Sequence, residues 1–313
     1  MAWKPYIPLG KLTLFDGDPA VGKSWASCAL AAAVTRGDGL PGMLETGQRD
    51  VLLLSAEDGL SDTVRPRLEA LGADLKRIKA HPALTLDERG FQQLEVRVAR
   101  YKPALIILDP LFAFVGGKKD IYRDNEARTV TTPLAELAQA HSCAIVAVRH
   151  LTKQQQKAIY AGSGSMAFIG AARSALLFGH DSNNTQKFGF VHAKSNLAPK
   201  GSAIGYNIER TWDGRGKFVW TGESDLTAEQ ILAMPDCKGK RAPTTSRAKE
   251  FLRDILGENE LPAEEVKTHA KSIGISSATL RRAAEELGII HDRESKGNSG
   301  NGKWLWKLPI QPA

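Results

Sequence analysis

The sequence predicts an α/β protein with a mostly parallel sheet, an antiparallel extension of that sheet and a small C-terminal domain. Three observations support this. Continuous apolar runs at 51–54, 104–108 and 143–148 are separated by helical patterns, which is typical of a parallel sheet covered on both faces. Short strand patterns joined by polar turns follow between 175 and 220. Residues 244–313 then carry three helical patterns and two short strands.

The large domain is expected to alternate strands and helices in its first half. Pro133 is acceptable because we place it in the first turn of its helix. The strands expected between 175 and 220 form antiparallel hairpins. In chain order we expect a strand at Leu12–Phe15, a helix at 25–36, a strand at 51–54, a helix at 62–71, a short strand near Ile78, a helix at 91–101, strands at 104–108 and 143–148 around a helix at 132–141, strands at 175–178, 188–192, 204–208 and 217–220, and a helix at 227–233.

A linker at 235–243, rich in basic residues and proline, is expected to separate domain 1–234 from domain 244–313. The small domain begins with a helix capped by Thr245. A second helix starts near Pro262, and a third runs from Ser277 to Leu287 and stops at Gly288. The strands Ile289–Ile290 and Lys303–Leu308 follow. Three helices followed by two strands is the layout of a winged helix-turn-helix domain.

Composition excludes several classes of protein. The 313 residues are 42% hydrophobic and 25% charged, as in an ordinary globular protein. The net charge of +7 is compatible with nucleic-acid binding but does not require it. Cys28, Cys143 and Cys237 form no close pair, which argues against a disulfide framework or a zinc site. Without a membrane-length apolar run or a signal-peptide pattern, we expect a cytoplasmic protein.

The most informative stretch is the phosphate-loop pattern G-x-x-x-x-G-K-S at residues 17–24, between an apolar strand and an Ala-rich helix. Its glycines let backbone amides surround a phosphate chain, the lysine reaches the β- and γ-phosphates, and the serine hydroxyl ligates Mg²⁺. A chance glycine turn would lack the flanking strand and helix. The predicted nucleotide-binding residues are Gly17, Asp18, Pro19, Ala20, Val21, Gly22, Lys23, Ser24 and Trp25.

Three further polar residues follow predicted strands. Asp109 closes the run 104–108 and can associate with Mg²⁺ beside the loop serine, although it could instead cap a helix. Glu57 follows the run 51–54 and can orient an attacking water, or it is a surface acid. His150 follows the run 143–148 and can sense the γ-phosphate, or it is an ordinary strand-end histidine. Ligands in such sheets bind at the carboxyl ends of strands, which favours a shared site.

Five segments in order resemble RecA-like ATPases, specifically the plasmid RepA group of hexameric replicative helicases within the RecA/DnaB superfamily. The resemblance spans roughly residues 7–220 and also fits a C-terminal winged-helix domain. The phosphate loop, of the AAA ATPase type, has Ala20 where a glycine is common. The segments are Gly17–Ser24, Ser55–Asp58, Leu108–Leu111, Arg149–Lys153, and Gly162–Phe168 with Ala171–Arg173.

The resemblance implies ATP hydrolysis with Mg²⁺ in a hexameric ring, by a replicative DNA helicase of a plasmid, phage or mobile element acting on single-stranded DNA. Glu57 would be the catalytic base beside Lys23, Asp109 the metal-associated acid and His150 the γ-phosphate sensor. Arg173 would be an arginine finger that reaches a neighbouring subunit, and Lys194 a second trans-acting cation; a surface salt bridge is the alternative for Arg173. Because no fused primase is evident, a separate primase or initiator protein would be a partner.

Two basic segments, Gly116–Arg128 and Lys153–Gly164, are candidate DNA-contacting loops, or else solvated surface loops. The first offers Lys118, Lys119, Arg123 and Arg128, and the second Lys153, Lys157 and Tyr160. In the small domain the candidates for DNA contact are Ser277, Thr279, Arg281, Arg282, Lys296 and Lys303, although winged helices also dock proteins.

Two other functions stay open. One is a recombination mediator of the RecA superfamily that hydrolyses ATP but does not unwind DNA. The other is a sequence-specific DNA-binding regulator in which ATP only controls assembly. A strand-displacement assay separates the first from a helicase, and a discrete footprint made by residues 244–313 would indicate the second.

Overall fold

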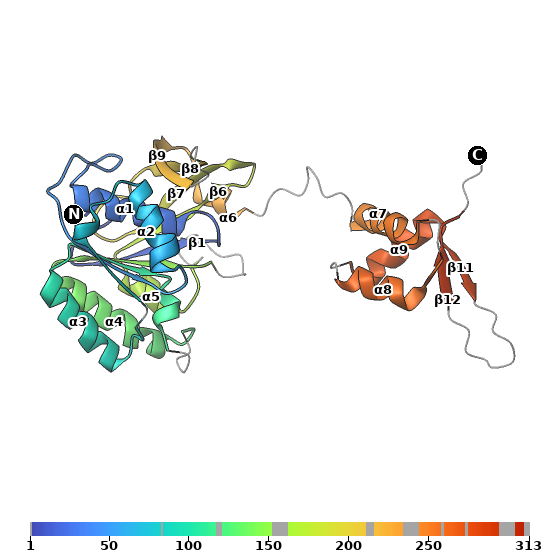
Figure 1. Ribbon diagram of the computed structural model, residues 1–313, viewed down its shortest axis with the longest axis horizontal. Coiled ribbons are helices and arrows are strands. Elements are labelled where there is room, and N and C mark those ends of the chain that lie inside the picture. The colour runs from blue at the N-terminus through green and yellow to red at the C-terminus, as the bar shows by residue number, and fades with distance from the viewer. Residues whose placement is uncertain are drawn as a thin grey trace. The chain divides into compact units, whose positions relative to one another are not determined.

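The chain divides into two compact units, Met1–Pro235 and Asp236–Ala313 (Figure 1). The computed structural model describes residues 2–82, 84–116, 121–151, 162–210, 216–233, 244–257, 260–272, 275–293 and 304–309. The linker predicted at 235–243 lies outside these residues, as does Cys237. No helix in the described part of the chain is long and apolar enough to cross a bilayer.

The described residues of the first unit form a nine-stranded sheet in the order β3-β2-β4-β5-β1-β6-β7-β8-β9. The six strands from β3 to β6 in this order are parallel, and β7, β8 and β9 extend the sheet as antiparallel neighbours. This confirms the predicted fold class. The strands are β1 (Leu12–Gly17), β2 (Val51–Ser55), β3 (Ile78–Pro82), β4 (Leu105–Asp109), β5 (Ala144–Arg149), β6 (Ser174–Asp181), β7 (Asn184–Ser195), β8 (Ala203–Arg210) and β9 (Gly216–Ser224).

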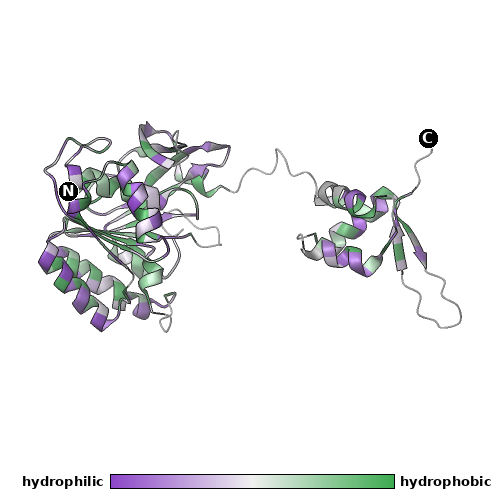
Figure 2. Ribbon diagram, viewed as in Figure 1, coloured by the Kyte–Doolittle hydropathy of each residue, from purple (hydrophilic) through white to green (hydrophobic). Residues whose placement is uncertain are grey.

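Helices cover both faces of this sheet, which explains why its parallel strands are apolar without alternation (Figure 1). One core lies between the sheet and α1 with α2, and the other lies between the sheet and α3, α4 and α5. Polar residues line the outer sides of α3 and α4 (Figure 2). The helices are α1 (Lys23–Arg36), the π-helix η1 (Leu60–Val64), α2 (Arg65–Ala70), the 3-10 helices η2 (Leu75–Arg77) and η3 (Leu111–Phe114), α3 (Glu88–Tyr101), α4 (Asp124–Ala140), α5 (Met166–Ala171) and α6 (Ala228–Leu232).

One expectation for this unit is wrong. The helix expected at 132–141 begins eight residues earlier, at Asp124, so Pro133 lies inside α4 rather than in its first turn. The early turns are helical because Ala127, Val130 and Leu134 share a buried face, which the basic residues of the segment concealed. The antiparallel run expected between 175 and 220 is confirmed, since β6 pairs with β7, β7 with β8 and β8 with β9. On its other edge β6 pairs in parallel with β1, which joins this run to the parallel strands.

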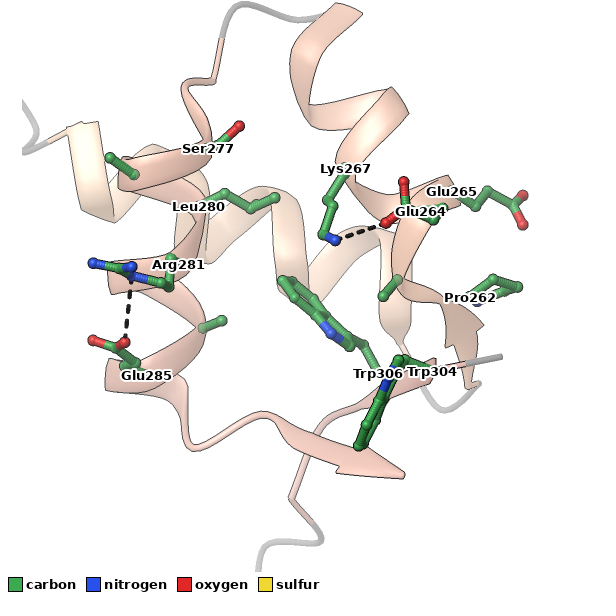
Figure 3. Close-up of a pocket in the computed structure, with 13 residues that line it drawn as sticks. Pro262, Glu264, Glu265, Lys267, Ser277, Leu280, Arg281, Glu285, Trp304 and Trp306 are labelled. Carbon is green, nitrogen blue, oxygen red and sulfur yellow. Dashed lines mark hydrogen bonds and ion pairs between the residues drawn. The ribbon is translucent and has the colours of Figure 1, made fainter. Parts of the chain in front are cut away.

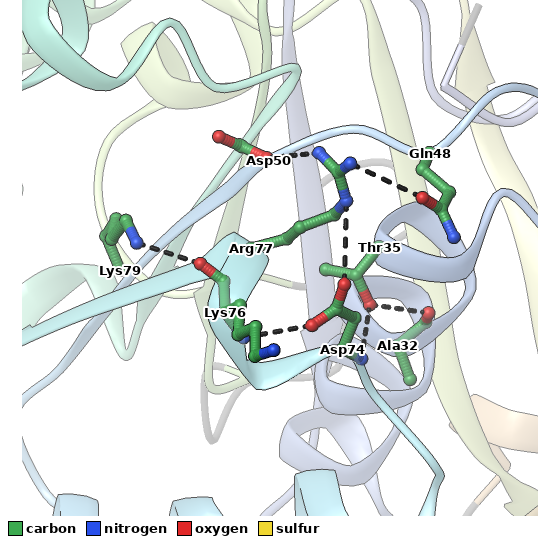
Figure 4. Close-up of polar contacts among 8 residues, drawn as sticks. All are labelled: Ala32, Thr35, Gln48, Asp50, Asp74, Lys76, Arg77 and Lys79. Atoms are coloured by element: carbon green, nitrogen blue, oxygen red, sulfur yellow. Dashed lines mark hydrogen bonds and ion pairs between the residues drawn. The ribbon is translucent and has the colours of Figure 1, made fainter.

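A polar network around Arg77 fixes the start of β2 and β3 against the end of α1 (Figure 4). The Arg77 guanidinium donates to Asp50 Oδ1 at 3.0 Å and to Gln48 Oε1 at 3.3 Å, and it lies 3.6 Å from Asp74 Oδ2. The backbone amide of Asp74 donates in turn to Thr35 Oγ1 on α1. These contacts lie at the amino ends of the parallel strands, so they are at the edge of the sheet opposite the carboxyl ends of the strands.

The second unit packs three helices on a small antiparallel sheet of order β10-β12-β11. Its core includes Leu252, Val266, Leu280 and Trp306. The elements are α7 (Thr244–Leu256), β10 (Leu261–Pro262), α8 (Ala263–Ser272), α9 (Ser277–Leu287), β11 (Ile290–Arg293) and β12 (Trp304–Lys307).

Two details of this unit differ from expectation. The second helix begins at Ala263, next to Pro262 as expected, but Pro262 itself lies in β10, where it pairs with Leu305 of β12. Proline is tolerated there because β10 is an edge strand. Thr245 lies inside α7 and is not its cap. The predicted end of α9 is confirmed, since Gly288 has a φ of 64° and its amide donates to Glu285 O.

Candidate functional site

The phosphate-loop segment connects the end of β1 to the start of α1, as the sequence indicates. Gly17 ends the strand at a point where a Cβ atom would lie 2.6 Å from Phe178 O, so a side chain is excluded. Gly22 precedes the helix with a φ of 92°, a conformation that suits glycine. The amides at the start of α1 and its positive dipole end therefore face the loop, which is a favourable arrangement for a phosphate.

Ala20 adopts a φ of 64°, in the left-handed region that residues with a side chain rarely occupy. Glycine at this position would remove a strain of about 1 kcal/mol. The loop therefore keeps a glycine-like backbone where the sequence has alanine.

Lys23 lies within the loop, with its side chain buried. Its ammonium group donates to Gly17 O at 2.7 Å and to Asp18 O at 2.6 Å. Burial lowers the pKa of Lys23 to about 8, against the opposing effect of Asp109. The cation is thus held inside the concavity that the loop amides surround.

Asp109 ends β4 beside two hydroxyl groups of α1. Ser24 is hydrogen-bonded to its carboxylate, and Ser27 Oγ lies 3.3 Å from Asp109 Oδ2. Burial raises the pKa of Asp109 to about 6, and the two serine hydrogen bonds oppose this rise. A carboxylate and a hydroxyl are hard oxygen donors of the kind that Mg²⁺ prefers. The residues present therefore fit a magnesium ion that shares its coordination with phosphate oxygens and water.

The turn after β2 carries Glu57 and Asp58 toward the same place. Ser55 Oγ donates to Asp58 O, and the Asp58 carboxylate accepts a 2.6 Å hydrogen bond from the Arg67 guanidinium. Arg67 also lies over the ring of Trp25, 5.2 Å from its centroid. These contacts fix the turn and leave Glu57 exposed to the pocket.

His150 follows β5 directly and completes this group. Its Nδ1 atom is buried and has no hydrogen-bond partner among the described residues. Together these strand ends surround a pocket of about 380 Å³, which we call the loop pocket. Its lining includes Pro19, Ala20, Gly22, Lys23, Ser24, Trp25, Glu57, Asp58, Arg67, Asp109 and His150. The structure thus brings together Lys23, Ser24, Glu57, Asp109 and His150.

Arg173 lies elsewhere, immediately before β6 and at the amino ends of the parallel strands. Its amide donates to Leu12 O at 2.9 Å, level with the start of β1. Gly17 lies five residues further along β1, on the order of 16 Å away. The Arg173 side chain is exposed and lines a second cavity, of about 550 Å³, which also contains Arg128 and Gly170.

Lys194 lies close to Arg173. Its ammonium group donates to the carbonyls of Ile169 and Ala172, the latter at 2.8 Å, at the end of α5. Burial lowers the pKa of Lys194, and the Arg173 cation lowers it further. Neither cation lines the loop pocket of its own chain.

The predicted DNA-contacting residues are only partly described. Arg123 precedes α4 and Arg128 lies on it, so the end of the first candidate loop is helical. Lys118, Lys119, Lys153, Lys157 and Tyr160 lie outside the described residues, as do Lys296 and Lys303.

The second unit contains an apolar groove of about 1110 Å³ between α8, α9 and β12 (Figure 3). Trp306 reaches the core beneath it, whereas Trp304 is 55% exposed at its edge. Arg281 lines the groove and lies 3.7 Å from Glu285 on the next turn of α9. The helix α9 thus presents an acidic group, Glu285, beside the predicted DNA-contacting residue Arg281.

Sequence reasoning missed Asp16, Ser27, Arg67 and Arg149. Asp16 and Arg149 are charged residues at the ends of otherwise apolar strands, and this position was a usable signal. Ser27 lies one turn after Ser24 on the same face of α1, and this spacing was a second usable signal.

Residues 1–156 match a family model described as an AAA domain. Comparison with curated proteins gives no match. Among solved structures, one described as an ATPase domain matches with a TM-score of 0.51 and 13% sequence identity, covering 67% of this chain and 85% of that one. At this identity the match shows a shared fold. The first unit therefore shares the fold of that ATPase domain, and the match to the AAA domain model lies within this unit.

Proposed function

We propose that this chain, whose residues 1–156 match an AAA domain, hydrolyses ATP with Mg²⁺ in a ring of identical subunits and acts as a motor on single-stranded DNA. The replicative DNA helicase of a plasmid, phage or mobile element is the function we favour. The observation that carries the proposal is the division of the predicted catalytic residues between two ends of one sheet. Lys23, Glu57, Asp109 and His150 gather at the carboxyl ends, and Arg173 lies at the amino ends.

The loop pocket supplies the part of the site contributed by one subunit. Lys23 and the amides at the start of α1 bind the phosphates of ATP. Ser24 and Asp109 would hold Mg²⁺, which neutralises charge on the β- and γ-phosphates. Glu57, which is exposed and lines the pocket, would orient the attacking water and accept its proton. The unpartnered Nδ1 of His150 can then bond to the γ-phosphate and register its loss.

The other part of the site comes from a neighbour. The Arg173 backbone lies on the order of 16 Å from Gly17, and Arg173 does not line the loop pocket of its own chain. A role as an arginine finger therefore requires a pocket on another chain. A guanidinium delivered across an interface stabilises the charge of the transition state only in an assembly. When one surface of each subunit binds a different surface of the next, the subunits form a ring if the rotation from one subunit to the next adds up to a full turn. We therefore favour a hexameric ring with Arg173 and Lys194 at each interface.

The DNA would lie along the basic segments 116–128 and 153–164, with phosphates held by charge and bases stacked on aromatic rings. For the second unit, the order of helices and strands supports a winged helix-turn-helix domain. Arg282 and Thr279 on α9 could contact DNA phosphates or base edges. A primase or an initiator protein is the partner that we expect for replication.

The pKa values in the loop pocket predict a bell-shaped pH dependence of kcat/KM. Activity requires Asp109 as a carboxylate and Lys23 as an ammonium. The pKa of about 6 for Asp109 makes activity fall as the pH drops through 6, and the pKa of about 8 for Lys23 makes it fall as the pH rises through 8. Steady-state ATPase assays measure both limbs. More Mg²⁺ should shift the acid limb to lower pH by competing with the proton, whereas an acid limb insensitive to Mg²⁺ would contradict the role of Asp109.

Two measurements test the proposed function directly. Electron microscopy of the chain with a non-hydrolysable ATP analogue and single-stranded DNA should show closed rings. Strand displacement on a forked duplex should depend on ATP hydrolysis. A monomer that hydrolyses ATP at the same specific rate at every protein concentration would refute the assembly. Rings with DNA-stimulated ATPase activity but no strand displacement would favour a recombination mediator.

A further inference from the structure

A buried ion pair joins two neighbouring strands immediately before the loop pocket. Asp16 of β1 is followed by Gly17, the first residue of the phosphate loop, and Arg149 of β5 is followed by His150. Arg149 Nε donates to Asp16 Oδ1 and Arg149 Nη2 to Asp16 Oδ2, each at 2.8 Å. The two side chains are 0% and 3% exposed. Burying two charges in a sheet core is costly, so a bidentate pair here calls for a role beyond stability.

The same guanidinium also holds the segment that leads into α5. Arg149 Nη1 donates to Ser163 O at 2.9 Å, and the guanidinium carbon lies 5.5 Å from the centre of the Phe168 ring on α5. Gly162 fits against the pair so closely that a Cβ atom there would lie 2.2 Å from Arg149 Nη2. The absence of a side chain at Gly162 is thus explained by its close contact with the ion pair.

A second connection reaches the same segment from the metal-associated strand. Phe112, three residues after Asp109, packs edge-on against Phe168 with ring centres 5.2 Å apart. Gly164 has a φ of 90°, and a Cβ atom there would lie 2.8 Å from the Phe112 ring. Segment 162–168 therefore contacts groups that follow β4 as well as β5.

Helix α5 carries these contacts on to Arg173. The helix spans Met166–Ala171, and Lys194 holds the carbonyls of Ile169 and Ala172 at its end. Arg173 is two residues beyond α5 and is fixed to β1 through Leu12 O. A continuous chain of contacts thus runs from the strand before the phosphate loop, through Arg149 and Phe168, to the exposed guanidinium.

We propose that Asp16 and Arg149 are positioning residues that couple the nucleotide in a chain's own loop pocket to the placement of that chain's Arg173 in the neighbouring site. The inference rests on the proposed function. Nucleotide bound between Gly17 and His150 acts on the two strand ends that the pair joins, and α5 transmits the change to the subunit interface. Each subunit would then activate its neighbour according to its own nucleotide state, which gives hydrolysis around the ring an order.

The test separates coupling from stability. Replacing both partners by apolar residues of similar size, Asp16→Val with Arg149→Met, removes the pair without leaving an unpaired buried charge. Arg149→Lys is the second variant, because its ammonium keeps the charge but has no fork to reach both Asp16 and Ser163. The matched control is Lys187→Met with Asp225→Val, which removes an exposed ion pair between β7 and the residue that follows β9. Thermal unfolding identifies which variants keep their fold.

Each variant is measured with and without Arg173→Ala, for ATP affinity and for kcat. We expect the folded pair variants to bind ATP within about threefold of wild type but to lose at least about tenfold in kcat, and Arg173→Ala to lower kcat much less in them than in wild type. The Lys187/Asp225 control should behave as wild type. The inference would be overturned if Arg173→Ala lowered kcat by the same factor in the pair variants as in wild type. It would also be overturned if the pair variants lost ATP affinity but kept the wild-type kcat. A wild-type rate that is independent of Arg173 would instead refute the proposed function, and this inference with it.

Discussion

Lys23→Ala is expected to lower ATP turnover by at least about 100-fold, because a preorganised cation on the β- and γ-phosphates is lost from a buried site. The fold should survive, since within the described part of the chain Lys23 Nζ donates only to Gly17 O and Asp18 O, both in its own loop. ATPase activity measured under steady state, together with circular dichroism, checks both statements.

Two controls sharpen this test. Lys11→Ala removes an exposed lysine whose ammonium donates to Gln139 on α4, and it should leave turnover unchanged. Lys23→Arg keeps the charge but replaces the compact ammonium with a larger planar guanidinium, so its turnover should be little higher than that of Lys23→Ala. Turnover by folded Lys23→Ala within about twofold of wild type would show that the loop does not bind catalytic phosphates.

The position of the loop pocket was predictable because several local signals agree on it. Apolar runs end at Leu54, Leu108 and Val148, and each is followed within three residues by a polar side chain. In a parallel sheet such positions must lie at one edge, whatever the strand order. The strand order itself, with β1 between β5 and β6, depends on contacts far apart in sequence and could not be derived from local patterns.

The groups that support this site were harder to predict. The contacts of Arg149 with Asp16 and Ser163 span 133 and 14 residues, and no local pattern indicates which charges pair. The early turns of α4 were missed for a different reason. Arg123 and Arg128 suggested a nucleic-acid loop, and that interpretation outweighed the helical spacing of Ala127 and Val130.

Arg173→Ala is expected to lower kcat by about 10³-fold while leaving ATP affinity within about threefold of wild type, because an arginine finger acts on the transition state. The affinity should persist because Arg173 is absent from the lining of its own chain's loop pocket. ATPase assays and titration with a fluorescent ATP analogue measure the two quantities. Arg89→Ala is the control, since Arg89 is exposed on α3 and lines neither the cavity beside Arg173 nor the loop pocket. A loss of affinity equal to the loss of kcat would contradict a trans-acting role.

Mixing the two inactive variants tests the shared site most directly. A Lys23→Ala chain keeps its Arg173, and an Arg173→Ala chain keeps an intact loop pocket. In a ring with one kind of interface, a complete site forms again wherever a Lys23→Ala chain supplies its Arg173 to the loop pocket of a neighbouring Arg173→Ala chain. An equal mixture should therefore regain up to about a quarter of the wild-type rate, because about one interface in four has the productive order. Chains that assemble together at every ratio without any recovery would show that Arg173 does not complete a neighbour's site.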